Sequence, residues 1–242
     1  MNVPANIEIA RDSEFLSELA VEARKLIQPH LNLVPLETGT VVARPYSKIE
    51  KAYFPVSTTF VVDIELKNDA SFTTGLIGSD GLLGAGMALD DRVSLYSVSA
   101  LSNGHAYSIA VQTLKELLLT VPEFRKRALA YEQYFLAQVQ QTAACSALHE
   151  LSGRLSSWLL RLQELAGDEL SLTQSDISRM LGVRRTSITE CALELQRDGA
   201  IDYRRGEISI LSKRKLAKAS CGCHAEVADH FSRLFEESFE DD

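Results

Sequence analysis

The sequence predicts an α+β protein with an N-terminal β domain, a long central helix and a C-terminal helical domain. Residues 33–111 contain short apolar runs separated by glycines, a pattern typical of a β-sandwich or jelly-roll barrel. Residues 122–165 then show helical periodicity with no further proline. Two short amphipathic stretches and a strand-turn-strand pattern follow over residues 172–210. A chain of 242 residues is long enough for two modest domains arranged in this way.

The composition excludes several classes of protein. Apolar residues make up 45% and charged residues 24% of the chain, which is ordinary globular usage. No apolar run reaches the roughly 18 residues that a membrane span needs, so we expect no membrane association. The N-terminus lacks the basic and apolar regions of a signal peptide. Four scattered cysteines predict reduced thiols and a cytoplasmic protein.

The charge of the chain is unevenly distributed. The net charge of the whole chain is −8, yet residues 172–218 contain ten basic and six acidic residues, a net charge of +4. The remainder is strongly acidic and ends in the sequence FEESFEDD. One basic module on an acidic chain is typical of a protein that contacts DNA through one face only.

We assign residues 1–120 to the β domain. It begins with a helix predicted over residues 12–28, where apolar side chains recur near helical spacing. Valine, threonine, tyrosine and phenylalanine are then frequent, and glycines mark the turns between the expected strands.

A long helix is predicted over residues 121–148. Pro122 suits its first turn, where the missing N–H has no cost. Two apolar stripes run along it, the first made of Leu129, Leu136, Val139 and Ala143, the second of Ala128, Tyr131 and Phe135. Such a helix can pack on its own domain and on a partner helix at once, which favours a homodimer. The alternative is a monomer that buries only one stripe.

Residues 149–217 are predicted to form a winged helix-turn-helix. Thr173 caps the first helix, Asp176 favours the same end, and Gly182 ends it. The second helix is expected over residues 184–198. The residues expected to face inward are Ile177, Met180 and Leu181 on the first helix and Ile188, Leu193 and Leu195 on the second, with Ala192 considered as an addition beside Leu193. The wing is a hairpin over residues 201–210, and residues 218–242 form a C-terminal tail.

The opening of the second helix has the chemistry of a DNA-binding surface. Arginine matches the O6 and N7 atoms of guanine, whereas hydroxyl groups and helix N-termini suit phosphate oxygens. The candidate contacts to double-stranded DNA are Thr173, Gln174, Arg184, Arg185, Thr186, Ser187, Thr189, Glu190, Arg204 and Arg205. The alternative is an ordinary helical hairpin with solvated arginines. The cap, the glycine turn, the arginine-rich opening and the basic wing together favour DNA binding.

The segment LTQSDISRMLGVRRTSITECALELQRDGAIDYRRGEISIL resembles the winged helix-turn-helix of the Crp/Fnr family of bacterial transcription regulators. The resemblance is strong over residues 149–217 and weak before Val111. It implies a cyclic-nucleotide-binding-like β-roll that senses an effector, dimerisation through the long helix, and RNA polymerase as a partner. The family's base-reading arginine matches Arg185 and its phosphate-binding hydroxyl matches Ser187. Thr186 stands where glutamate is frequent and Glu190 where a second arginine is, so the family's best-known operator is not expected.

The β-roll lacks part of the family's cyclic-nucleotide pattern. Members that bind these nucleotides carry a glutamate for the ribose and an arginine with a hydroxyl residue for the phosphate. Arg92 and Ser94 lie near the arginine position, but Leu82 and Leu83 stand in the stretch where the glutamate is expected. We therefore expect an effector other than cyclic AMP, or none. The alternative is a regulator that binds a nucleotide or another small molecule in a degenerate pocket near Arg92.

No cofactor is expected. The N-terminus has no cysteine for an iron–sulfur cluster, and neither His30 nor His105 stands in a recognisable haem-ligand setting. A catalytic cupin would need a histidine pair, whereas residues 33–111 contain only His105, so an enzyme is disfavoured.

One further motif offers metal ligands. In the segment CGCHAEVADH these are Cys221, Cys223, His224 and His230. Structural zinc sites usually separate paired cysteines by two or more residues, so the single-residue spacing favours a reduced, partly packed tail over a metal site.

Overall fold

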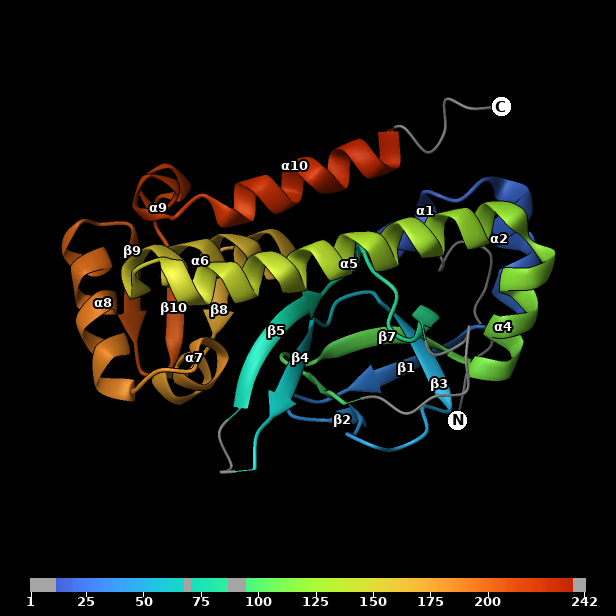
Figure 1. Ribbon diagram of the computed structural model, residues 1–242, viewed down its shortest axis with the longest axis horizontal. Coiled ribbons are helices and arrows are strands. Elements are labelled where there is room, and N and C mark those ends of the chain that lie inside the picture. The colour runs from blue at the N-terminus through green and yellow to red at the C-terminus, as the bar shows by residue number, and fades with distance from the viewer. Residues whose placement is uncertain (1–11, 68–70, 87–94, 237–242) are drawn as a thin grey trace. The chain divides into compact units, whose positions relative to one another are not determined.

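The computed structural model describes residues 12–67, 71–86 and 95–236 (Figure 1). The chain forms two compact units. The first comprises residues 1–62, 76–136 and 233–242, and the second comprises residues 63–75 and 137–232. None of the helices in the described part of the chain combines the length and apolarity that a membrane span requires. Arg92 and Ser94 lie outside the described residues.

The first unit begins with two short helices, α1 (Glu14–Ser17) and α2 (Val21–Ile27), followed by the 3-10 helix η2 (Gln28–His30). The prediction of one continuous helix over residues 12–28 is therefore wrong. Ala20 is extended, with ψ 151°, and interrupts the helix between α1 and α2. Its N–H donates to Glu123 Oε1 at 2.6 Å instead of to a helical carbonyl, so a side chain distant in sequence fixes the break.

Two antiparallel sheets follow, as predicted. One has the strand order β1-β7-β3 and the other β2-β6-β4-β5. The strands are β1 (Asn32–Leu36), β2 (Val41–Ala43), β3 (Lys51–Pro55), β4 (Phe60–Glu65), β5 (Ser71–Ile77), β6 (Ser97–Ala100) and β7 (Gly104–Ala110). Strand β7 is central in its sheet, with Tyr107 opposite Leu33 on one side and Phe54 on the other.

The core of the first unit joins this β region to the helices α4 (Val111–Thr120) and α5 (Pro122–Leu148). Phe15 lies at its centre, 5.6 Å from the ring of Phe54 and 5.9 Å from that of Tyr131. Phe124 packs edge-on against Phe15 at 6.3 Å. Aromatic pairs in these arrangements add to the free energy gained from burial, so the start of α5 is firmly held in this unit.

The two predicted stripes of α5 differ in exposure. Ala128 and Tyr131 are buried, with 2% and 1% of their surfaces exposed. Leu129 and Leu136 are 47% and 55% exposed in the isolated chain. The second stripe is thus used by the chain's own core, and the first presents apolar side chains to the surroundings.

The second unit contains the end of α5 and the predicted winged helix-turn-helix. Its further elements are α6 (Leu151–Ala166), β8 (Glu169–Ser171), α7 (Gln174–Leu181), α8 (Arg185–Arg197), β9 (Ile201–Arg204), β10 (Glu207–Ile210), α9 (Lys213–Ala219) and the first part of α10 (Cys223–Glu236). Strand β8 was not predicted, and it completes a three-stranded sheet of order β8-β10-β9. Helix α10 occupies much of the expected C-terminal tail.

The turn between α7 and α8 follows local rules. Thr173 and Asp176 form a reciprocal capping box at the start of α7. Gly182 ends that helix in the left-handed region, with φ 64°, which glycine adopts at little cost. Nη2 of the buried Arg154 donates to the carbonyl of Leu181 at 2.7 Å. These contacts pair backbone polar groups at both ends of α7.

The prediction that Leu193 of α8 faces inward is wrong. Leu193 is 46% exposed, whereas Ile188, Ala192 and Leu195 are buried. These three positions are four and three residues apart, so they share one helical face, and Leu193 lies about 100° away from Ala192 around the axis. Of the two neighbours considered for this position, Ala192 is the core residue.

Candidate nucleic-acid interface

The start of α8 is exposed and free of acidic residues. Arg184 is the extended residue before the helix, and its side chain makes no capping hydrogen bond. The side chains of Arg184, Arg185 and Thr186 are all exposed. The first turn of α8 contains no acid. A helix N-terminus carries partial positive charge from its unsatisfied N–H groups, so this end of α8 suits an anion such as a DNA phosphate.

Arg185 is oriented by the preceding helix. Its Nε donates to Gln174 Oε1 at 3.0 Å, which leaves the two terminal nitrogens of the guanidinium for another acceptor. Gln174 begins α7, so the two helices of the motif jointly orient this side chain. A guanidinium fixed at Nε has fewer rotamers to lose on binding, which favours a two-pronged contact with one base.

A hollow of about 350 Å³ lies between the helices and the wing. The residues that line it are Thr173, Gln174, Arg185, Tyr203, Arg205 and Gly206. Four of them were predicted contacts, and the structure brings these four together. Tyr203 and Gly206 were missed. The alternation of Ile201 and Tyr203 along β9 indicates that these two residues share a face of the strand, but not that Tyr203 lies beside Arg185.

The wing tip is a tight two-residue turn. Arg205 and Gly206 have φ values of 54° and 87°, the left-handed pair of a type I′ hairpin turn. Arginine rarely adopts this conformation, and here it places a cation at the end of the hairpin. Tyr203 supports the same strand, since its Oη donates to the carbonyl of Leu172 at 3.2 Å. Burial raises the pKa of the Tyr203 phenol, so it remains a neutral donor.

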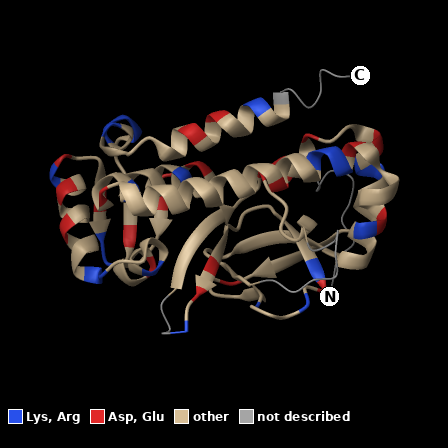
Figure 2. Ribbon diagram, in the orientation of Figure 1, with Lys and Arg blue, Asp and Glu red and all other residues tan. Residues whose placement is uncertain are grey.

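The basic residues of the module divide into paired and unpaired groups. Arg204 Nε lies 3.0 Å from Asp202 Oδ2, and Lys213 Nζ lies 3.4 Å from Glu164 Oε1. Arg179 similarly lies 3.5 Å from Asp176. Within the described residues, Arg184, Arg185 and Arg205 have no carboxylate at ion-pair distance. Cations without a carboxylate partner among the described residues thus lie at the start of α8 and at the wing tip, and Arg197 is a further one at the other end of α8. Figure 2 shows basic residues at both ends of this helix.

The remaining predicted DNA contacts differ in exposure and in whether their side chains are already hydrogen-bonded. Thr189 donates its hydroxyl to the carbonyl of Arg185 at 3.1 Å, so it serves the helix itself. Ser187 is half-buried, and Glu190 is exposed one turn further along α8. The predicted set thus contains an exposed group around Arg185 and members whose side chains are already engaged.

The described positions considered for a nucleotide ribose or a haem ligand form no assembled site. Leu82 and Leu83 are core residues, 1% and 3% exposed. His30 and His105 are exposed and belong to no described cluster of potential metal ligands. His224 Nε2 instead lies 2.8 Å from Glu164 Oε2.

The comparisons with known proteins agree with this geometry. Residues 153–219 match the family model of the Crp-like helix-turn-helix domain. None of the curated proteins matches the sequence.

Solved structures of Crp/Fnr regulators share the fold. A regulator of that family from Eubacterium rectale ATCC 33656 is 18% identical, with a TM-score of 0.67 over 86% of this chain and 98% of its own. The c-di-GMP-responsive global regulator CLP of Xanthomonas campestris is 16% identical, with a TM-score of 0.67 over 80% and 100% of the two chains. FixK2 from Bradyrhizobium japonicum is 11% identical, with a TM-score of 0.68 over 79% and 98%.

Fold and interface together define a winged helix-turn-helix protein with an N-terminal β-roll. Residues 153–219 match the Crp-like helix-turn-helix domain, and the chain shares the fold of solved Crp/Fnr transcription regulators. The resemblance and the fold class predicted from the sequence are both confirmed.

Proposed function

We propose that this protein is a sequence-specific transcription regulator that binds an inverted-repeat operator as a homodimer. The observation that supports this most is the group of unpaired arginines: Arg185 and Arg205 line the hollow, and Arg184 precedes Arg185 at the exposed start of α8. An acidic chain that leaves these cations without carboxylate partners has a surface suited to a polyanion. In a helix-turn-helix, that end of the second helix enters the major groove.

The residues have distinct roles in this proposal. Arg185 reads a guanine through its two terminal nitrogens while Gln174 holds its Nε. Glu190, one turn further, faces a neighbouring base, where a carboxylate accepts from the amino group of cytosine. The groups that contact the sugar-phosphate backbone are Thr173, Gln174, Arg184, Thr186, Ser187, Arg204 and Arg205. Thr189 instead supports the turn of α8 that carries Arg185.

The dimer forms through the exposed stripe of α5. Leu129 and Leu136 are seven residues apart and half-exposed, a spacing that suits pairing with the same helix of a second chain. The proposed organisation is a β-roll over residues 1–120, a dimerisation helix over 121–148, a DNA-binding domain over 149–217 and a C-terminal segment over 218–242. RNA polymerase in the cytoplasm is the proposed downstream partner, and we infer no enzymatic activity.

We infer that cyclic AMP is not the effector. The stretch expected to supply a ribose acceptor contains Leu82 and Leu83, whose side chains are buried in the core. Millimolar cyclic AMP should therefore leave the melting temperature and the DNA affinity unchanged. A ligand at about 100 times its dissociation constant would add about 2.7 kcal/mol, which a thermal melt detects readily. A clear rise in melting temperature would instead support the alternative, a pocket near Arg92.

Selection from a random DNA pool by the purified full-length protein tests the proposed function. The selected site should be an inverted repeat with half-site centres about 10–10.5 base pairs apart, or a multiple of that spacing. Failure to enrich any sequence over the starting pool, in protein that is folded and dimeric, would contradict sequence-specific binding.

A further inference from the structure

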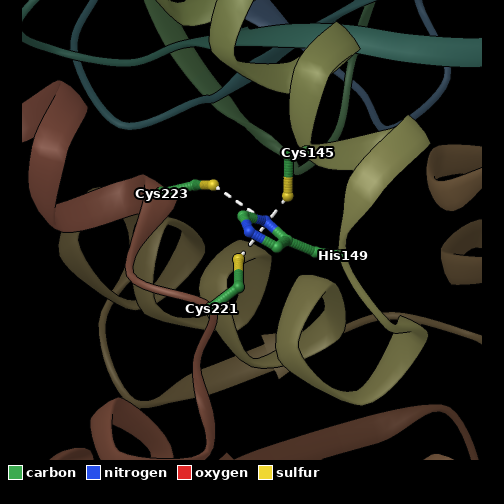
Figure 3. A group of neighbouring side chains, drawn as sticks. All are labelled: Cys145, His149, Cys221 and Cys223. Carbon is green, nitrogen blue, oxygen red and sulfur yellow. Dashed lines mark hydrogen bonds between the residues drawn. The ribbon is translucent and has the colours of Figure 1, made fainter.

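Three cysteines and one histidine converge in the second unit. Figure 3 shows Cys145 in the last turn of α5 and His149 directly after that helix, with Cys221 from the connection between α9 and α10 and Cys223 at the start of α10. Their potential ligand atoms all lie within 4.8 Å of one another. Sγ of Cys145 lies 3.5 Å from Sγ of Cys221, and Sγ of Cys223 lies 3.3 Å from Nδ1 of His149. All four cysteines of the protein are free thiols, so no disulfide occupies the cluster.

Local structure explains why these four side chains meet. Cys145 and His149 are four residues apart, one helical turn, and therefore point from the same side of α5. Gly222 adopts a φ of 82°, which turns the chain between the two other cysteines so that both approach the cluster. This left-handed glycine makes a single-residue spacing compatible with two ligands, a possibility that spacing alone disfavours.

Gly153 in α6 provides the room for this approach. Its carbonyl accepts the N–H of Cys221 at 3.2 Å. A Cβ at residue 153 would lie 3.2 Å from both Cβ and N of Cys221. Contacts this short require the neighbouring segment to give way. The helix surface at residue 153 is thus shaped to hold the backbone of Cys221 close.

Polar groups around the cluster point donors at its sulfur atoms. Gln141 Nε2 donates to Sγ of Cys223 at 3.2 Å. Ser157 Oγ, on a residue only 6% exposed, lies 3.1 Å from Sγ of Cys221. Hydrogen bonds from an outer shell orient metal ligands and stabilise thiolate charge.

We propose that Cys145, His149, Cys221 and Cys223 bind a Zn²⁺ ion in a closed, tetrahedral structural site. Zinc–sulfur bonds of about 2.3 Å place tetrahedral sulfur atoms roughly 3.7 Å apart, close to the 3.5 Å between the sulfur atoms of Cys145 and Cys221. Three thiolates and one imidazole are a set typical of structural zinc. Zinc binding replaces the three thiol protons, which pass to solvent, and leaves the imidazole neutral.

A redox disulfide explains the cluster less well. Cys145 and Cys221 are close enough to be considered for one, but a disulfide would use only two of the four groups. It would leave the approach of His149 to Cys223, and the donor from Gln141, without a role. A metal ion bound by four ligands would use all four side chains of the cluster. It would also tie the end of α5 to the α9–α10 connection, segments 76 residues apart in sequence.

The tail histidines are not part of the proposed site. Both lie in the segment whose spacing suggested metal ligands, but His224 pairs with Glu164 at 2.8 Å. His230 is absent from the cluster of potential ligands. The two ligands that complete the site come instead from α5, which no local motif indicates.

Metal analysis of the full-length protein tests the proposal. Purified under reducing conditions and reconstituted with Zn²⁺, the protein should retain about one zinc per chain after removal of free metal. Cys221→Ser and His149→Ala should lose most of it. The matched controls Cys191→Ser and His224→Ala, outside the ligand set, should retain it. Zinc bound equally by the two ligand variants, or none bound by the parent chain, overturns the proposal.

Cobalt substitution keeps the test independent of whether the variants fold. Co²⁺ added to the metal-free parent protein should give a thiolate-to-metal charge-transfer band and the intense d–d bands of a tetrahedral site. Added Zn²⁺ should abolish these bands. A spectrum without the thiolate band, or recovery of a Cys145–Cys221 disulfide in place of metal under reducing conditions, would contradict zinc coordination.

Discussion

The start of α8 and the cysteine cluster use polar side chains in opposite ways, although both lie in the second unit. At α8 the cations are exposed and have no acidic partners among the described residues. In the cluster the thiols and the imidazole face one another, Gln141 donates to the sulfur of Cys223, and Ser157 is hydrogen-bonded to Cys221. Exposed, unpaired charge serves recognition of a separate molecule, whereas converging groups serve a ligand that becomes part of the fold.

The largest expected effect comes from removing the proposed zinc ion from the cysteine cluster. Chelation of zinc under reducing conditions should lower the unfolding free energy by about 4 kcal/mol if free zinc was about 1,000 times its dissociation constant. Thermal melts with and without chelator measure this change. Cys221→Ser, which lacks one ligand, should show no chelator effect. If the melting temperature of the parent protein does not respond to chelation, the cluster holds no ion that stabilises the fold, which contradicts this difference between the two sites.

The next largest effect should be loss of the proposed dimer when a charge is introduced into the exposed stripe of α5. Leu136→Glu would bury a carboxylate in the proposed dimer seam, so the variant should sediment as a monomer. Because Leu136 is 55% exposed in the single chain, the fold of that chain should survive. Leu119→Glu is the matched control, since Leu119 is 69% exposed on α4, outside the stripe. A dimeric Leu136→Glu variant would assign the subunit contact to another surface.

A smaller effect separates the two wing arginines. Arg205 is unpaired at the turn, whereas Arg204 is held by Asp202. Arg205→Asn, which keeps a residue tolerant of positive φ, should reduce the salt slope of DNA binding by about 1 on specific and random DNA alike. Arg204→Gln should change the slope less. Titrations at several salt concentrations measure both, and the reverse order would show that the Asp202 pair opens on DNA.

Local rules made much of the DNA-binding module predictable from sequence. Thr173, Gly182 and Gly199 act on the residues beside them, so a cap or a stop can be inferred within a few positions. Strand β8 is only three residues long and depends on pairing with β10, so no local signal identifies it. The sequence also indicated Leu193 as a core residue where the structure buries its neighbour Ala192. In a short helix the apolar pattern defines the buried face to within one residue at best.

The cysteine cluster depends on contacts that spacing cannot indicate. Cys145 and Cys221 meet across 76 positions of sequence, and Gly153 and Gly222 allow the approach. The sequence therefore suggested His224 and His230, which follow the paired cysteines within the same segment, and missed His149. Tyr203 was missed in a similar way, since its place beside Arg185 requires the wing to fold against the two helices.

Binding of Arg185→Ala to the selected operator and to each of its single-base variants tests the recognition surface most directly. We expect relaxed preference at one base pair in each half-site, with a loss of discrimination of about 1–3 kcal/mol there. Arg197→Ala, which removes the same charge at the opposite, exposed end of α8, should leave base preference unchanged. Equal weakening on every sequence by Arg185→Ala would contradict base reading by this residue and move that role to Arg184 or Glu190.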